Sequence, residues 1–118
     1  MFNLLPVYNE DGDFDFKKLT DMVGVTDKEL TKILKISEST IKRNKTSLQT
    51  RMKSRNLLYI LNLLSKITHN DKAKIKSWLH EPRPEWNGLT PLSLVNLGKE
   101  QGVIEYLNEI VNDDLMGT

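Results

Sequence analysis

The sequence has no cysteine among its 118 residues. Disulfide bonds, thiolate metal sites and cysteine nucleophiles are therefore excluded. It also lacks any run of the roughly 18 uncharged apolar residues that cross a bilayer. Residues 1–6 have neither the basic start nor the long apolar stretch of a secretory signal. We therefore expect a cytoplasmic protein without a membrane-spanning segment.

Residue types that carry catalysis are scarce as well. The two histidines, His69 and His80, have no third metal ligand at a recognisable spacing. Ser37 and Ser39 have no base nearby in the sequence and fit helix caps or DNA contacts better than nucleophiles. No glycine-rich phosphate loop is present. We expect no catalytic residue, no cofactor and no metal site, so the protein is not predicted to be an enzyme.

The net charge of +1 conceals an uneven distribution of charge along the chain. Residues 1–27 carry six acidic side chains and two lysines, and residues 81–118 carry seven acidic and two basic ones. Between them, residues 35–55 carry seven basic side chains and only one acidic one, Glu38. A basic block between two acidic ones indicates a surface that binds a polyanion, although a solvated helix face would give the same pattern.

The apolar residues recur at helical spacing, and no segment alternates as a half-buried strand does. The sequence predicts an all-α fold: an N-terminal helix-turn-helix bundle in 1–53, then a small helical domain in 54–118. The first helix is expected at 15–23, and a second one begins at a capping box formed by Thr26 and Glu29. Further helices are expected at 38–47, 54–67, 71–80, 91–97 and 101–112. Gly24 should end the first helix, Thr68 or Asn70 should start the fifth, and Thr90-Pro91 should start the sixth.

Residues 26–45 have the features of a helix-turn-helix, two short helices joined by a tight turn. Apolar residues within this stretch supply the packing positions, and polar or basic ones supply the surface that enters the major groove. The candidate DNA-binding residues are Ser37, Ser39, Thr40, Lys42, Arg43 and Lys45. Arg43 suits a bidentate contact with guanine, and Lys42 and Lys45 suit phosphates.

One residue in this motif departs from the usual pattern. Lys35 stands in the turn where glycine is common, and the left-handed conformation costs a non-glycine residue about 1 to 2 kcal/mol. A helical hairpin with a solvated outer face is the alternative interpretation of the motif.

The second half of the chain carries five motifs in a fixed order. They are Trp78-Leu79, Pro82-Arg83-Pro84, Gly88-Leu89-Thr90-Pro91-Leu92, Gly102 and a final helix that contains Tyr106. In this order they resemble the C-terminal toxin-binding domain of the Xre/MbcA/ParS-type antitoxins. Ser54-Arg55, at the start of the long helix, and the Xre-like helix-turn-helix before it extend the resemblance to about residues 25–112.

The resemblance implies a type II antitoxin that dimerises, binds the promoter of its own operon and blocks the active site of a RES-domain toxin. That toxin is an NAD-consuming enzyme, so the catalytic chemistry belongs to the partner. The residues implied to face the toxin are Trp86, Asn87, Gly88, Gly102, Tyr106, Glu109, Asn112 and Asp113. Asn112-Asp113-Asp114 departs from the family, whose members place a glycine close behind the last helix.

The sequence leaves three questions open. The chain is a stand-alone helix-turn-helix regulator if its second half serves only for dimerisation or ligand sensing. Trp86 is either an exposed interface anchor or a cover on the core. The acidic tail is either a toxin contact or a solvated end.

Overall fold

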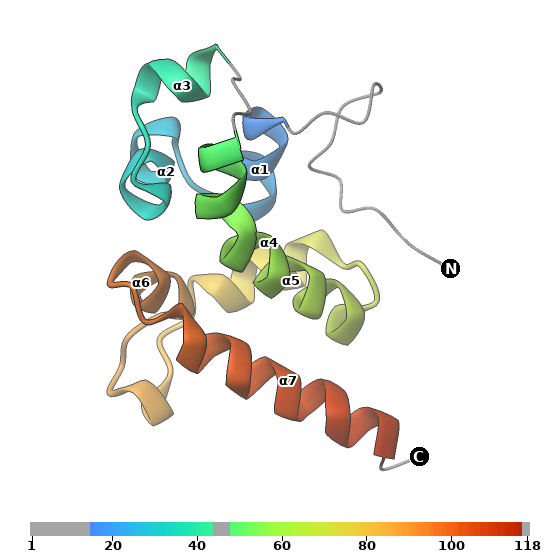
Figure 1. The fold of residues 1–118 in the computed structure, drawn as a ribbon. Helices are drawn as coiled ribbons and strands as arrows, with labels where there is room; N and C mark the ends of the chain where they lie inside the picture. The colour runs from blue at the N-terminus through green and yellow to red at the C-terminus, as the bar shows by residue number, and fades with distance from the viewer. Residues whose placement is uncertain (1–14, 44–47, 117–118) are drawn as a thin grey trace. The chain divides into compact units, whose positions relative to one another are not determined.

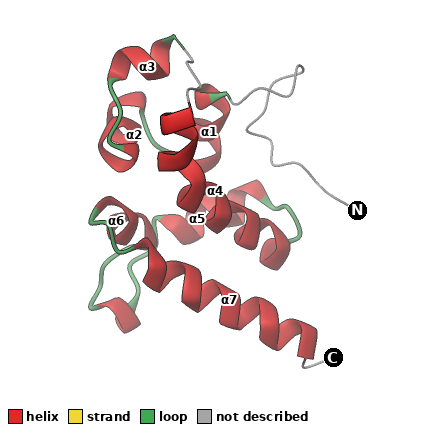
Figure 2. Cartoon of the chain, in the orientation of Figure 1, coloured by secondary structure: helices red, strands yellow, loops and turns green. Residues whose placement is uncertain are grey.

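The computed structural model describes residues 15–43 and 48–116, and all of the regular structure in these two ranges is helical (Figure 2). The predicted all-α class is therefore confirmed. None of the helices in these ranges combines the length and the hydropathy that a membrane crossing requires. The chain forms two compact units, one ending at Arg55 and the other beginning at Asn56. This division lies inside the long helix α4, Leu48–Thr68.

The first unit begins with α1, Phe16–Val23, whose ends are set by local backbone chemistry. The carboxylate of Asp15 accepts a hydrogen bond of 2.9 Å from the Lys17 amide, which satisfies one of the free N–H groups at the helix start. Gly24 ends the helix as predicted, with a φ of 78° that suits glycine. Between these ends, Phe16, Leu19 and Val23 are fully buried.

Helix α2, Asp27–Leu34, begins with the predicted capping box. The Glu29 amide donates to Thr26 Oγ1 at 3.1 Å, and the Thr26 amide donates to Glu29 Oε1 at 3.4 Å. Lys35 then takes the left-handed conformation, with φ 55° and ψ 47°, and allows the chain to turn sharply into α3. Figure 1 shows α2 and α3 as neighbouring short helices.

Helix α3, Glu38–Lys42, begins with the Ser37 cap, as expected, but it is shorter than predicted. The helix ends at Lys42 with Arg43 as its C-cap, and residues 44–47 lie outside the described ranges. Conversely, α4 begins at Leu48 and not at Ser54. The apolar pattern missed this first part, and two apolar side chains described there, Leu48 and Met52, are 75% and 58% exposed and so form no buried stripe.

The second unit contains α4 from Asn56 onward, α5 (Lys72–Leu79), the short 3-10 helix η1 (Pro84–Trp86), α6 (Pro91–Asn96) and α7 (Glu100–Met116). Its buried apolar side chains come from each α-helix: Leu57, Ile60, Leu61, Leu63, Leu64, Ile75, Leu79, Leu92, Leu94, Val95, Val103, Ile104 and Leu107. The α4 stripe predicted from the sequence therefore supplies the largest share of this core.

The helix starts in this unit follow capping chemistry, with one correction. Asp71 caps α5 by accepting from the Lys74 amide at 3.1 Å, in place of the predicted Thr68 or Asn70. Thr90 caps α6 as predicted, accepting from the Ser93 amide at 3.0 Å. The last helix extends to Met116, four residues beyond the predicted end at Asn112.

The left-handed conformation of Lys35 generates a test of this fold. Replacing Lys35 with glycine should raise the free energy of unfolding by about 1 kcal/mol, because glycine adopts a positive φ without steric cost. The matched control is Lys32→Gly, which places glycine inside α2 and should lower stability by about 1 kcal/mol. Urea unfolding of both variants measures the two effects, and a loss of stability in Lys35→Gly would contradict the assigned turn.

Candidate functional site

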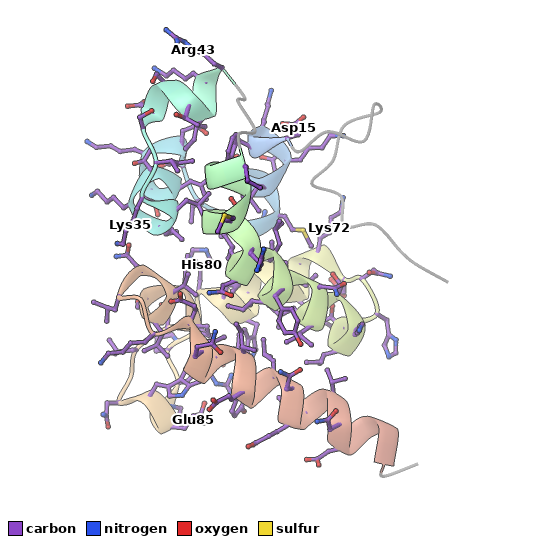
Figure 3. The ribbon with its side chains drawn as sticks, viewed as in Figure 1. Asp15, Lys35, Arg43, Lys72, His80 and Glu85 are labelled. Atoms are coloured by element: carbon purple, nitrogen blue, oxygen red, sulfur yellow. The ribbon has the colours of Figure 1, made fainter. Side chains whose placement is uncertain are left out.

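The α3 surface carries most of the predicted DNA-binding residues. Four of them, Ser37, Ser39, Lys42 and Arg43, are exposed, whereas Thr40 is half-buried. Lys45 lies outside the described residues. Figure 3 shows the Arg43 side chain extending from the end of α3. Ile41 is buried on the inner side of the helix and fixes it in the unit. The arrangement leaves short hydroxyls and two cations directed to solvent.

The hydroxyl groups at the start of α3 already have partners. Ser37 Oγ accepts from the Thr40 amide at 3.1 Å, and it also lies 2.7 Å from Thr40 Oγ1 and 3.1 Å from Ser39 Oγ. Ser37 is therefore first a helix cap. Ser39 is the most accessible of the three hydroxyls for an external hydrogen bond, because it is exposed and does not cap the helix.

The cations around α3 are only weakly neutralised. Lys42 Nζ lies 3.6 Å from Glu38 Oε1, and the two side chains are 68% and 53% exposed. An exposed pair of this kind contributes at most about 1 kcal/mol, so Lys42 can exchange it for another anion. Lys28 and Lys32 are also exposed, one turn apart on α2. Sequence reasoning missed these two lysines because they precede the basic block.

A cluster of three aromatic rings forms the most distinctive feature of the second unit. Trp78 lies in the last turn of α5, Trp86 ends η1 and Tyr106 lies in α7. The ring centroids of Trp86 and Tyr106 are 5.3 Å apart in an edge-to-face arrangement, and those of Trp78 and Tyr106 are 6.3 Å apart and stacked. Trp78 and Trp86 meet edge to face at 6.2 Å. Such contacts add about 0.5 to 1.5 kcal/mol per pair beyond burial.

The guanidinium of Arg83 lies against all three rings of this cluster. Its Cζ is 5.3 Å from the centroids of Trp78 and Tyr106, and 6.0 Å from that of Trp86. Arg83 Nη2 donates to the Tyr106 hydroxyl at 3.0 Å, and Nε forms an ion pair with Glu85. Desolvation alone would lower the pKa of Arg83, but Glu85 and Tyr106 outweigh it and raise that pKa, so the side chain stays charged.

The loop around this cluster is closed by its own backbone. The Gly88 amide donates to the Arg83 carbonyl at 2.9 Å, and the Arg83 amide donates to the Leu89 carbonyl at 3.1 Å. Asn87 and Gly88 have φ angles of 56° and 83°. A Cβ added at Gly88 would meet nothing within 4 Å, so glycine is favoured there by its backbone angle and not by a lack of space.

The structure brings together the predicted loop residues and Tyr106. Trp86 is half-buried against Trp78 and Tyr106, while Asn87 and Gly88 are exposed beside it. Trp86 therefore covers the cluster in part, and its exposed part leaves the interface-anchor interpretation a prediction. Sequence reasoning missed Arg83. Its signals were its place in the motif Pro82-Arg83-Pro84 and its position as one of two basic residues in 81–118.

The remaining predicted residues of α7 extend away from this loop. Gly102, Glu109, Asn112 and Asp113 are all exposed. Gly102, Tyr106, Glu109 and Asp113 follow one another at intervals of four, three and four residues, so they share one side of the helix. We call this side the α7 face. It carries carboxylates and no basic residue, because α7 contains no lysine or arginine.

The hydrogen bond between Arg83 and Tyr106 can be tested without removing the ring. Tyr106→Phe should lower the free energy of unfolding by about 0.5 to 1.5 kcal/mol, because it leaves a half-buried donor unpaired. The control is Tyr59→Phe, whose hydroxyl is exposed and lies 3.5 Å from Asn108 Oδ1. Chemical denaturation should show a smaller effect for the control. If both variants lose the same stability, the Arg83–Tyr106 hydrogen bond does not stabilise the cluster.

Comparisons with known protein families and with curated proteins give no match to this sequence. The fold does have a similar solved structure. It matches a chain of the crystal structure of the M. tuberculosis MbcT-MbcA toxin-antitoxin complex with a TM-score of 0.59 and 18% sequence identity. The match covers 79% of this chain and 86% of the other. The protein therefore shares its fold with a component of a toxin-antitoxin complex.

Proposed function

We propose that this protein is an antitoxin, and that its partner toxin binds the loop at 83–89 together with the α7 face. The observation that carries the proposal is the fold similarity to a chain of the MbcT-MbcA toxin-antitoxin complex over most of both chains. The loop also supports the proposal, because Trp86 is partly exposed and packs against the rings of Trp78 and Tyr106. Aromatic residues held in this way are favoured interface anchors.

The charges of the α7 face define the partner surface that would fit it. Glu109 and Asp113 on this face are exposed, and no basic side chain lies on the helix. A partner with a basic rim would be steered toward such a face and held in one orientation. We assign the partner to the RES-domain toxins on the sequence resemblance. The catalytic chemistry then lies in the toxin, and the antitoxin itself is cytoplasmic, dimeric and without catalysis or a cofactor.

We further propose that the first unit binds the promoter of the toxin-antitoxin operon and represses it. Support comes from the exposed cations at the end of α3, from Ile41 that anchors this helix, and from Lys28 and Lys32 nearby in the sequence. Lys42 and the lysines would contact phosphates, and Arg43 would contact a base. The α3 helix has only five residues, so base contacts would be few.

Co-expression tests the antitoxin role. The protein encoded beside this chain should arrest growth when expressed alone, and this chain should form a complex with it and restore growth. The double variant Glu109→Lys, Asp113→Lys should weaken the complex by about tenfold or more, because like charges then face each other across the interface. Lys74→Glu, an exposed change on α5, is the control and should bind normally. If neither complex nor rescue is found, the antitoxin role is wrong.

Gel shifts on the operon promoter test the DNA-binding role. Arg43→Ala should cost about 1 to 3 kcal/mol of binding free energy if Arg43 reads a base. Glu38→Gln should strengthen binding, because it removes a negative charge and frees Lys42 from its ion pair. Lys66→Ala, in the second unit, should have little effect. Unchanged binding by Arg43→Ala would remove this residue from the site. If the protein binds DNA but no toxin, the alternative of a stand-alone regulator is favoured.

A further inference from the structure

We propose that Arg83 is a positioning residue that holds the loop at 83–89 in the shape that the partner recognises. This inference rests on the proposed function for its partner, but the loop closure that it describes is a property of the free protein. Arg83 was not among the residues that the sequence or the resemblance placed at the interface. Its role follows from the contacts of both its backbone and its side chain.

The loop has only a partial hydrophobic anchor, because Trp86 is half-buried against Trp78 and Tyr106. None of the residues from Glu81 to Leu89 is buried, and η1 contributes no buried side chain. The loop also contains two consecutive residues with positive φ, Asn87 and Gly88. The non-glycine one of these, Asn87, is in a region that other L-residues seldom adopt. A segment of this kind needs contacts outside itself to remain in one conformation.

Arg83 provides these contacts at two levels. Its carbonyl accepts from the amides of Trp86, at 3.1 Å, and Gly88, at 2.9 Å, and its own amide donates to the Leu89 carbonyl. Its side chain, 19% exposed, touches rings from α5, η1 and α7. The same residue therefore closes the backbone of the loop and fastens that closed loop to two helices of the core.

The chemistry of the site requires a guanidinium in particular. The planar group faces aromatic rings while two different nitrogens, Nη2 and Nε, reach Tyr106 and Glu85. A lysine ammonium offers a single nitrogen and cannot serve both partners in this fixed geometry. Lysine should therefore retain the charge and part of the ring contact but lose the orientation of the loop.

The consequence for binding is a lower cost of ordering. Because the loop is already closed in the free protein, binding a partner does not include the entropic cost of ordering the loop residues. Trp86 and Asn87 are then presented in one arrangement, and Glu85 is held in its ion pair with Arg83. Loss of Arg83 should weaken the complex although Arg83 itself is largely covered by the cluster.

Hydrogen exchange of the free protein tests the closure. In Arg83→Met, protection of the Gly88 and Leu89 amides should fall at least tenfold, and the near-ultraviolet circular dichroism of the aromatic cluster should decrease. Protection of the Leu107 amide inside α7 should not change. Arg83→Lys should lie between Arg83→Met and the wild type. Lys76→Met, an exposed change on α5, is the control for loss of a cation and should match the wild type.

Affinity for the co-expressed toxin tests the consequence for binding. Arg83→Met should raise its Kd about tenfold, with Arg83→Lys in between. Unchanged protection at Gly88 and Leu89 overturns the proposal. So does an equal loss of protection at Leu107, which would make Arg83 a general stabiliser, or a weakened complex with an unchanged loop, which would make it a direct contact. If the wild type binds no toxin, the proposed function and the binding consequence fail together, while hydrogen exchange still decides the closure.

Discussion

Most of this structure depends on how the free backbone groups at the ends of short helices are satisfied. Five of the α-helices in the described residues have eight residues or fewer, so unpaired N–H and C=O groups make up a large part of each. Helices of this length are not stable alone in water. Each of the five starts with a side-chain cap, from Asp15, Thr26, Ser37, Asp71 and Thr90. The caps define where a helix begins, and the buried stripes then decide which side of it packs.

The two candidate surfaces are built in different ways. The α3 surface lies on a short helix whose start is fixed by Ser37 and whose inner side is fixed by Ile41. Its exposed cations, Lys42 and Arg43, have long side chains with several rotatable bonds. The loop in the second unit instead uses aromatic rings and Arg83 to give a fixed shape. An adaptable cationic surface suits phosphates, which carry little sequence information, whereas a fixed aromatic surface suits a specific protein.

Electrostatics also separate the two surfaces. The Glu38–Lys42 pair is exposed and contributes little to stability, so its main effect is on the charge that α3 presents. The Arg83–Glu85 pair is more covered, and the aromatic rings and the Tyr106 hydroxyl fix its orientation. In α7, the absence of any basic residue leaves the carboxylates of Glu105 and Glu109 without a partner on their own helix. Opposite charges thus characterise the two surfaces of a nearly neutral chain.

The sequence by itself determined the helical class and most helix starts, because the Thr26–Glu29 capping box, the Ser37 cap and Thr90-Pro91 act within a few residues. Gly24 marked the end of the first helix in the same way. The sequence also identified Lys35 as a left-handed turn residue, which the structure confirms. It misplaced the start of α4 and the ends of α3 and α7, where no buried stripe marks the boundary. Only the tertiary structure revealed Arg83. Rings from three separate segments converge on its guanidinium, and contacts across such distances in sequence leave no local pattern to detect.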